Sequence, residues 1–266
     1  MNQPRDNAMA KWTAFPYDAD DYTYDAAALK KHWARLHKGD AEPFPKDEAV
    51  QAAWALFHAG EFKKAADAGV KAGGAGMAVA NKAQCIYANY LETSEKTKLA
   101  LFLEVAERAE AQAKAEPKNF AAHYWQAYAL GRYSQGISVA KALTQGLGAK
   151  VKNALETTIA LAPKHADAHI ALGAFHAEVI DKVGKLLGKT QGADTATGLK
   201  MFKEALALNP DSAIARVEYA NGLVMLEGDK RMKEAEKLYA EAAECKPLDA
   251  MERLDVEMAR EELEDE

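Results

Sequence analysis

The stretch "EALALNPDSAIARVEYANGLV", residues 204 to 224, contains the pattern that decides the fold. Its first part reads as a helix that stops at Pro210, because proline lacks an amide donor and clashes with the preceding helical turn. A second helical pattern follows, and the small residue Ala220 lies ten positions after the proline. The stretch therefore predicts the end of one helix, a short turn and a new helix.

The same arrangement recurs along the chain. Helical runs also stop at three further prolines, Pro117, Pro163 and Pro247. A small residue lies ten positions after the first two of these, Ala127 and Gly173, and weaker copies of the unit surround Ala53 and Ala88. Such self-similarity is typical of repeat proteins, in which each helical hairpin buries its apolar stripe against its neighbours. We expect an all-α fold, a right-handed superhelical α-solenoid of about five hairpins with a concave inner wall.

The repeats also predict how the chain is divided. We expect the solenoid to span residues 46–247, after an N-terminal arm with a short helix in residues 1–45. Residues 248–266 read as an acidic capping helix whose polar outer face ends the stack in water. The first three repeat prolines are 46 and 47 residues apart. Because the usual unit has about 34 residues, two hairpins must carry insertions that lengthen the loop between their helices.

Two segments, "NPDSAIARVEYANGLV" and "APKHADAHIALGAFHA", resemble tetratricopeptide repeats, with the small residue of the first helix and the closing proline in place. The segments "FAAHYWQAYALGRYSQGISVAKALTQGLG" (120–148) and "TATGLKMFKEALALNPDS" (195–212) are similar to the regulator of microtubule dynamics family, which shares the aromatic-rich helix and lengthened hairpins. This resemblance implies a binding scaffold built from repeats. For animal members it implies association with microtubules or membrane contact sites.

Composition and charge exclude several classes of protein. The net charge of −6 argues against a nucleic-acid binder, which needs a basic face. No apolar run approaches the roughly 18 residues of a membrane span, and the start of the chain has no secretory signal. Cys85 and Cys245 read as free thiols, so we expect a cytoplasmic protein. Residues 137–203 hold nine lysines against five acids; they read as a solvated helix surface or as a basic patch for an acidic partner.

Three histidines in "HADAHIALGAFHAEV" (165–179), His165, His169 and His176, fall on one helical face. A zinc site would need a further ligand and an acid beside the pair, and Ala166 stands in the position of that acid. We therefore expect no metal and no cofactor. His169 shares a repeat position with His123, and both His169 and His176 are expected to pack between helices.

Function is expected on the concave wall. In a tetratricopeptide hairpin, fixed positions around the small residue of the first helix face the groove, and they predict a peptide-binding set: Trp54, Asn89, Tyr124, Tyr128, Arg132, Glu178, Asn221 and Met225. With no paired nucleophile and base in view, we expect a non-enzymatic scaffold that binds a peptide or protein segment. The alternative is a small-molecule or metal-binding accessory protein that uses a cavity between the long hairpins, with His123, His169 and His176.

The segment "WTAFPYDADDYTY" (12–24) contains five aromatic residues and no helical period. An exposed arm of this composition would leave a large apolar patch in water. It is expected to pack against the first repeats, or to occupy a groove in this molecule or in a neighbour. The second version would allow self-association through the arm.

Overall fold

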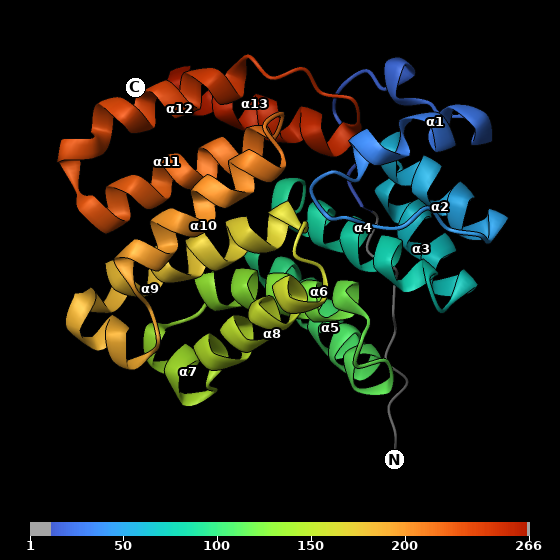
Figure 1. Ribbon diagram of the computed structural model, residues 1–266. Coiled ribbons are helices and arrows are strands. Elements are labelled where there is room, and N and C mark those ends of the chain that lie inside the picture. Colours follow the sequence, from blue (N-terminus) through green and yellow to red (C-terminus); the bar gives the residue numbers. More distant parts are fainter. Residues whose placement is uncertain (1–11, 265–266) are drawn as a thin grey trace.

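The computed structural model describes residues 12–264, and the regular structure within that range is helical (Figure 1). Five hairpins follow one another and pack in sequence: α2 (Glu48–His58) with α3 (Phe62–Ala72), α4 (Gly76–Tyr90) with α5 (Glu95–Ala115), α6 (Phe120–Gln135) with α8 (Leu147–Leu161), α9 (Ala166–Thr190) with α10 (Thr195–Leu208), and α11 (Ala213–Glu227) with α12 (Met232–Ala243). Outside these pairs lie η1 (Asp20–Tyr22), α1 (Ala26–Leu36), α7 (Val139–Thr144), η2 (Asp229–Arg231) and α13 (Ala250–Glu264). The predicted all-α solenoid is confirmed.

The repeat prolines lie where helices end. Helices α5, α8 and α10 each stop two residues before one of them. The helix that follows begins after a residue whose side chain accepts a hydrogen bond from a backbone amide in the first turn. This bond satisfies an amide that would otherwise be unpaired. These N-cap residues are Asn119, His165 and Ser212. His165 therefore occupies a capping position that asparagine and serine fill in the neighbouring repeats.

The small residues let the two helices of a hairpin approach closely. Ala127 and Ala220 are buried at 1% and 0% exposure. At Gly173 an added Cβ would lie 2.9 Å from the ring of Phe202 on α10, and at Gly222 it would lie 2.3 Å from the same ring. One buried phenylalanine thus fills the space left by glycines on two helices, and it ties α9, α10 and α11 together.

The two long repeats carry insertions of different form. In the third hairpin the insertion is α7 with its flanking turns. In the fourth, α9 continues beyond the length of its counterparts and bends at Gly184, whose φ of 78° and ψ of 161° are rarely adopted by other residues. Residues 185–190 form a short helical piece after this bend. No helix of residues 12–264 is long and apolar enough to cross a membrane.

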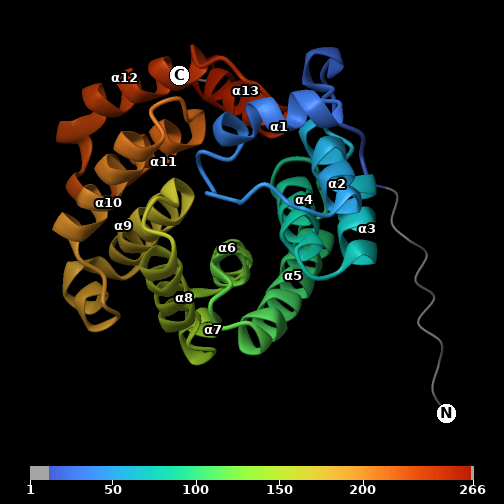
Figure 2. The same cartoon turned by 45° about the vertical axis from the view of Figure 1, so that its right-hand side comes forward.

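The hairpins curve until the two ends of the solenoid meet (Figure 2). The last helix, α13, contacts α2 as well as α11 and α12. Residues 37–46 turn inward from α1, and the backbone carbonyl of Gly39 accepts a hydrogen bond of 3.0 Å from the amide of Asp167 on α9. The concave wall is therefore closed at one side by the chain's own N-terminal segment, where an open curved rod was expected.

The aromatic arm packs against both ends of the solenoid. Trp12 stacks on Tyr87 of α4 at 4.1 Å between ring centroids, and Phe15 lies edge-on to Phe62 of α3. The guanidinium of Arg253 on α13 lies 5.0 Å from the ring centre of Tyr17. The arm thus packs on the first two hairpins and also on α13. Residues 1–11 and 265–266, which belong to the predicted arm and cap, lie outside the described residues.

Helix α13 differs from the expected cap. It covers α11 and α12 at the end of the stack, but the side turned toward the N-terminal segment is not a free polar face. Leu254 and Asp255 are buried at 5% and 3% exposure. The reason is the curvature, which brings this helix against the first repeat instead of leaving it in water.

Candidate binding site inside the solenoid

The inner faces of α4, α6, α9 and α11, together with residues of α7, α8 and α13, line two adjoining compartments, which we call the inner recess. The inner compartment has a volume of about 230 Å³ and the outer one about 330 Å³. Seven of the eight predicted groove residues line them. Tyr124 and Tyr128 face the inner compartment, Asn89, Asn221 and Met225 face the outer one, and Arg132 and Glu178 border both.

Trp54 lies apart from this set. It is buried at 1% exposure beneath α1, edge-on to Trp33, and lines neither compartment. The repeat register places Trp54 on the inner wall of the first hairpin correctly, but the N-terminal segment covers that part of the wall. Trp54 is therefore a core residue in this structure.

Two polar contacts divide the inner recess. Arg132 donates to Glu218 across 3.0 Å, and Gln135 donates to Glu178 across 2.6 Å. Burial, followed by the neighbouring carboxylate of Glu218, raises the pKa of Glu178. The guanidinium of Arg132 also lies 5.4 Å from the ring centre of Tyr128. This partition carries charges of both signs and connects α6 with α9 and α11.

The inner compartment combines aromatic rings with buried acids. Tyr124 packs against Trp125 at 4.9 Å between centroids. Tyr90 donates a short hydrogen bond to Asp255, whose pKa is raised well above its usual range, mainly by burial. Burial also raises the pKa of Asp167 to about 7. Asp167 borders this compartment, and within residues 12–264 its carboxyl group makes no hydrogen bond, although its oxygens lie against Gly39 and the charge of Lys82 acts to lower its pKa.

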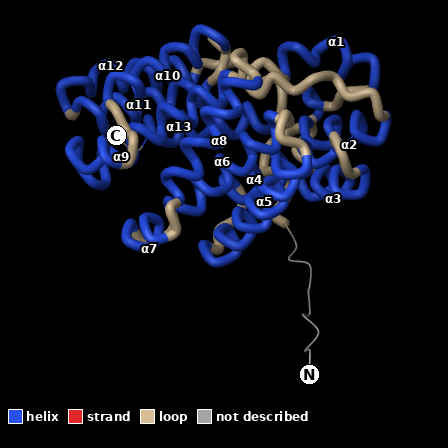
Figure 3. Tube along the Cα trace, turned by 60° about the horizontal axis from the view of Figure 1, so that its bottom comes forward, coloured by secondary structure: helices blue, strands red, loops and turns tan. Residues whose placement is uncertain are grey.

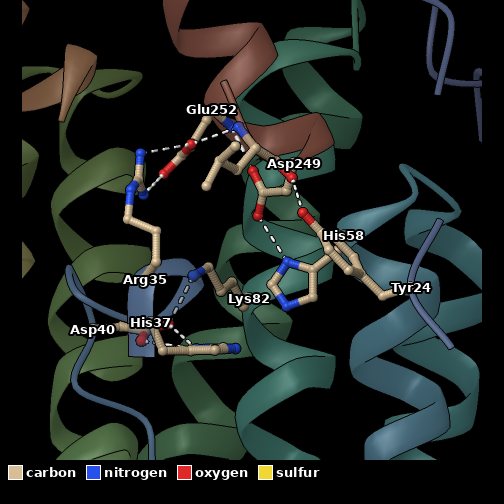
Figure 4. A network of polar contacts seen from close by, with 9 residues as sticks. Tyr24, Arg35, His37, Asp40, His58, Lys82, Asp249 and Glu252 are labelled. Atoms are coloured by element: carbon tan, nitrogen blue, oxygen red, sulfur yellow. Dashed lines mark hydrogen bonds and ion pairs between the residues drawn. The ribbon is translucent and has the colours of Figure 1, made fainter. Parts of the chain in front are cut away.

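A second polar cluster joins the two ends of the solenoid, and we call it the closure network (Figure 4). Its core is Asp40, which accepts hydrogen bonds of 2.7 Å from Lys82 and 2.9 Å from Nδ1 of His37. All three are buried to at least 95%. Burial lowers the pKa of His37 to about 4, so this imidazole is neutral at pH 7. Although burial alone would raise the pKa of Asp40, His37 and Lys82 hold it well below its usual value.

The remaining contacts of the closure network reach α13 and its approach. His58 on α2 pairs with Asp249 at 2.8 Å, and Arg35 on α1 pairs with Glu252 at 2.5 Å. Tyr24 donates to the backbone carbonyl of residue 248 at 2.6 Å. Sequence reasoning missed this network because its partners are 191 to 224 positions apart. The aromatic arm and the acidic C-terminal segment were the two signals that pointed toward it.

The histidines of the repeats have structural partners. Nδ1 of His169 donates to the carbonyl of His165 at 3.0 Å, and Nδ1 of His176 accepts from the amide of Asp194 at 3.1 Å. His123, which shares the repeat position of His169, is partly exposed and donates to the carbonyl of Pro117. Among the described residues, no three His, Cys, Asp or Glu side chains form a group that could hold a metal ion.

Comparison with known proteins gives a family and structural relatives. The family model described as Regulator of microtubule dynamics protein 1-3 matches residues 76–265. A crystal structure of TTC0263, a thermophilic TPR protein of Thermus thermophilus, is similar over 80% of this chain and 97% of its own length, with a TM-score of 0.57 and 18% identity. At that identity the likeness shows the fold alone. A search of the curated proteins finds no match.

Proposed function

Since this chain belongs to the regulator of microtubule dynamics family, we propose that it is a non-enzymatic scaffold that holds a short segment of a partner protein in the inner recess. The observation that carries this proposal is the convergence of seven groove residues, predicted from one repeat register, on two adjoining compartments. Tetratricopeptide-like repeats offer such inner walls to extended partners.

The dimensions of the inner recess limit what it holds. Because the N-terminal segment closes one side of the ring, a long peptide has no continuous groove to follow. The outer compartment has amide groups on Asn89 and Asn221 and an apolar side chain in Met225. Amides can pair with a peptide backbone, and the neighbouring apolar surface favours one or two hydrophobic side chains. We infer a segment of a few residues with an apolar anchor.

Side-chain chemistry also supports a binding role over a catalytic one. Cys85 lies behind the recess, and burial raises its pKa, so the thiol stays protonated and is a poor nucleophile. Asp255, Glu178 and Glu218 are held by Tyr90, Gln135 and Arg132, and Asp167, with a pKa of about 7, is about half protonated at neutral pH.

The test is selection of short random peptides on the immobilised full chain, followed by affinity measurement with variants. Met225→Asp and Asn89→Asp should weaken selected peptides by tenfold or more, because each adds a charge to the outer compartment. Met232→Asp on α12 is the matched control, since Met225 and Met232 are both 37% exposed. Peptides that bind all three variants equally, or no selectable binder at all, would refute the proposal.

A second candidate rests on Asp167. An unpaired carboxyl beside the rings of Tyr124 and Trp125 suits a small organic cation, which would gain an ion pair and contacts with aromatic faces. This would be a small-molecule function of the inner compartment. Native mass spectrometry with a panel of aromatic and aliphatic amines tests it, and binding should disappear in Asp167→Asn. Amine binding that persists in this variant would exclude the candidate.

A further inference from the structure

The two insertions of the solenoid expose its most accessible large apolar side chains. Among the large apolar side chains of the described residues, the three most exposed are Leu186 at 85%, Leu187 at 60% and Leu143 at 50%. Val139 adds a fourth at 40%. Single exposed hydrophobic residues are normal on a protein surface, whereas a group of them marks an interaction site.

The insertions lie on the same side of the molecule, although they are about 40 residues apart in sequence. An added Cβ on Gly192 would lie 3.2 Å from Lys152, so the start of α8 contacts the turn that follows α9. Leu143 and Val183 both border the inner compartment. In Figures 1 and 3, α7 and the end of α9 project on the same side of the molecule. We call residues 136–152 and 182–193 together the lysine–leucine tip.

The charge of the tip has one sign. It contains six lysines and no aspartate or glutamate. Lys152 and Lys182 pair with acids outside the tip, on Glu156 and Glu178. Within the described part of the chain, Lys150, Lys185 and Lys189 make no ion pair. In a protein with a net charge of −6, this local excess is not explained by overall composition.

We propose that the lysine–leucine tip docks on the surface of an anionic lipid bilayer. Leucines that enter the boundary between headgroups and acyl chains, with lysines beside them in the headgroup layer, are the pattern of interfacial binding. The lysines are attracted to anionic headgroups at the same time.

Two features favour a bilayer over an acidic protein. Leu186 and Leu187 stand on a short helical piece and line neither compartment of the inner recess, and Leu186 is 85% exposed. The bend at Gly184 sets the last piece of α9 at an angle to the body of that helix. A fluid interface accepts such separate projections, whereas a folded partner would need a surface that matches both.

The experiment is sedimentation of the full chain with phosphatidylcholine vesicles that contain or lack phosphatidylserine. We expect binding to the anionic vesicles only, weakening as salt is raised. Lys185→Glu with Lys189→Glu should weaken it more than tenfold, at about fivefold for each lysine lost. Leu186→Ser with Leu187→Ser should also weaken it at least tenfold, because two apolar side chains no longer leave water.

Matched controls use exposed positions away from the tip. Val70→Ser on α3, where the valine is 46% exposed, is the control for the leucine variant. Lys233→Glu with Lys237→Glu on α12 is the control for the lysine variant. Both controls should bind like the unaltered chain. Hydrogen exchange should slow at residues 139–144 and 185–190 when vesicles are present. Thermal unfolding of each variant confirms that the fold is intact.

The contradicting outcomes are distinct. Absence of binding to anionic vesicles would overturn the proposal, as would leucine variants that bind as well as the unaltered chain. If an acidic polypeptide binds the tip and vesicles do not, the partner is a protein and the proposal of a bilayer surface is wrong. The variants that test peptide binding, at Asn89 and Met225, lie in the outer compartment and outside the tip, so either proposal can fail without the other.

Discussion

The closure network and the lysine–leucine tip use charged and apolar side chains in opposite ways. In the closure network, Asp40, Lys82 and His37 are buried and paired, and the contacts of Arg35 and His58 join segments about 200 residues apart. In the tip, Lys150, Lys185 and Lys189 make no ion pair within residues 12–264, and Leu186 and Leu187 face solvent. The first arrangement stabilises the fold. The second adds little to stability, so its side chains need an explanation outside the fold.

The largest loss of stability is expected when the closure network loses its central charge. Asp40→Asn leaves Lys82, at 2% exposure, without its anionic partner. An uncompensated buried charge costs about 3–5 kcal/mol, and we expect that loss in the free energy of unfolding measured with urea. Adding Lys82→Met should restore most of the loss. A double variant as unstable as the sum of both single changes would show that the pair is not the cause.

A matched pair of leucines compares the two regions directly. Leu29 in α1 is 1% exposed and Leu187 in the tip is 60% exposed. Leu29→Ala should lower the free energy of unfolding by about 2–5 kcal/mol, from lost burial and the cavity left behind. Leu187→Ala should change it by less than about 0.5 kcal/mol. Equal losses in denaturant unfolding would mean that the tip is part of the core.

The pH dependence of stability tests the closed side of the solenoid. Burial, followed by the charge of Asp40, raises the pKa of Glu42 to about 8. The folded chain therefore keeps a proton that the unfolded chain releases near pH 4.5, and stability falls as pH rises from there to 8. Glu42→Gln removes this loss. The variant should match the unaltered chain at pH 4 and exceed it by up to about 4 kcal/mol at pH 8, since each unit of pKa shift is worth about 1.4 kcal/mol.

The smallest effect on stability is expected at the bend of the tip. Gly184→Ala places a side chain at a φ of 78° and ψ of 161°, a conformation that costs other residues about 1–3 kcal/mol. Nothing lies within 4 Å of the added Cβ, so the tip can change shape to relieve the strain. The free energy of unfolding should fall by less than about 1 kcal/mol while hydrogen exchange quickens at residues 185–190. A loss as large as that of Leu29→Ala would contradict this.

The repeats were predictable because their signals are local. Pro210 ends a helix through its own ring, and Gly173 permits close packing within one hairpin. Each signal acts over a few residues or one hairpin, and periodicity repeats it along the chain. The inner faces of α6, α9 and α11 followed from the same register, which is why Tyr128, Glu178 and Asn221 were found together.

The closed side was not predictable in the same way. Whether α13 meets α2 depends on the small rotation between successive hairpins, summed over all of them. No single residue determines this total rotation. Trp54 was therefore assigned to the groove, although the N-terminal segment covers that part of the wall. The polar partners that hold the closure, such as His58 and Asp249, are ordinary residues when read one at a time.

Joining the ends of the solenoid also limits how such a chain can change during evolution. An open array of hairpins gains or loses a unit with little penalty, because only the neighbours of that unit are affected. Here an added hairpin would move α13 away from α1 and separate Arg35 from Glu252. The contacts of the closure network therefore fix the number of repeats, and duplication of a hairpin would require the loss of those contacts.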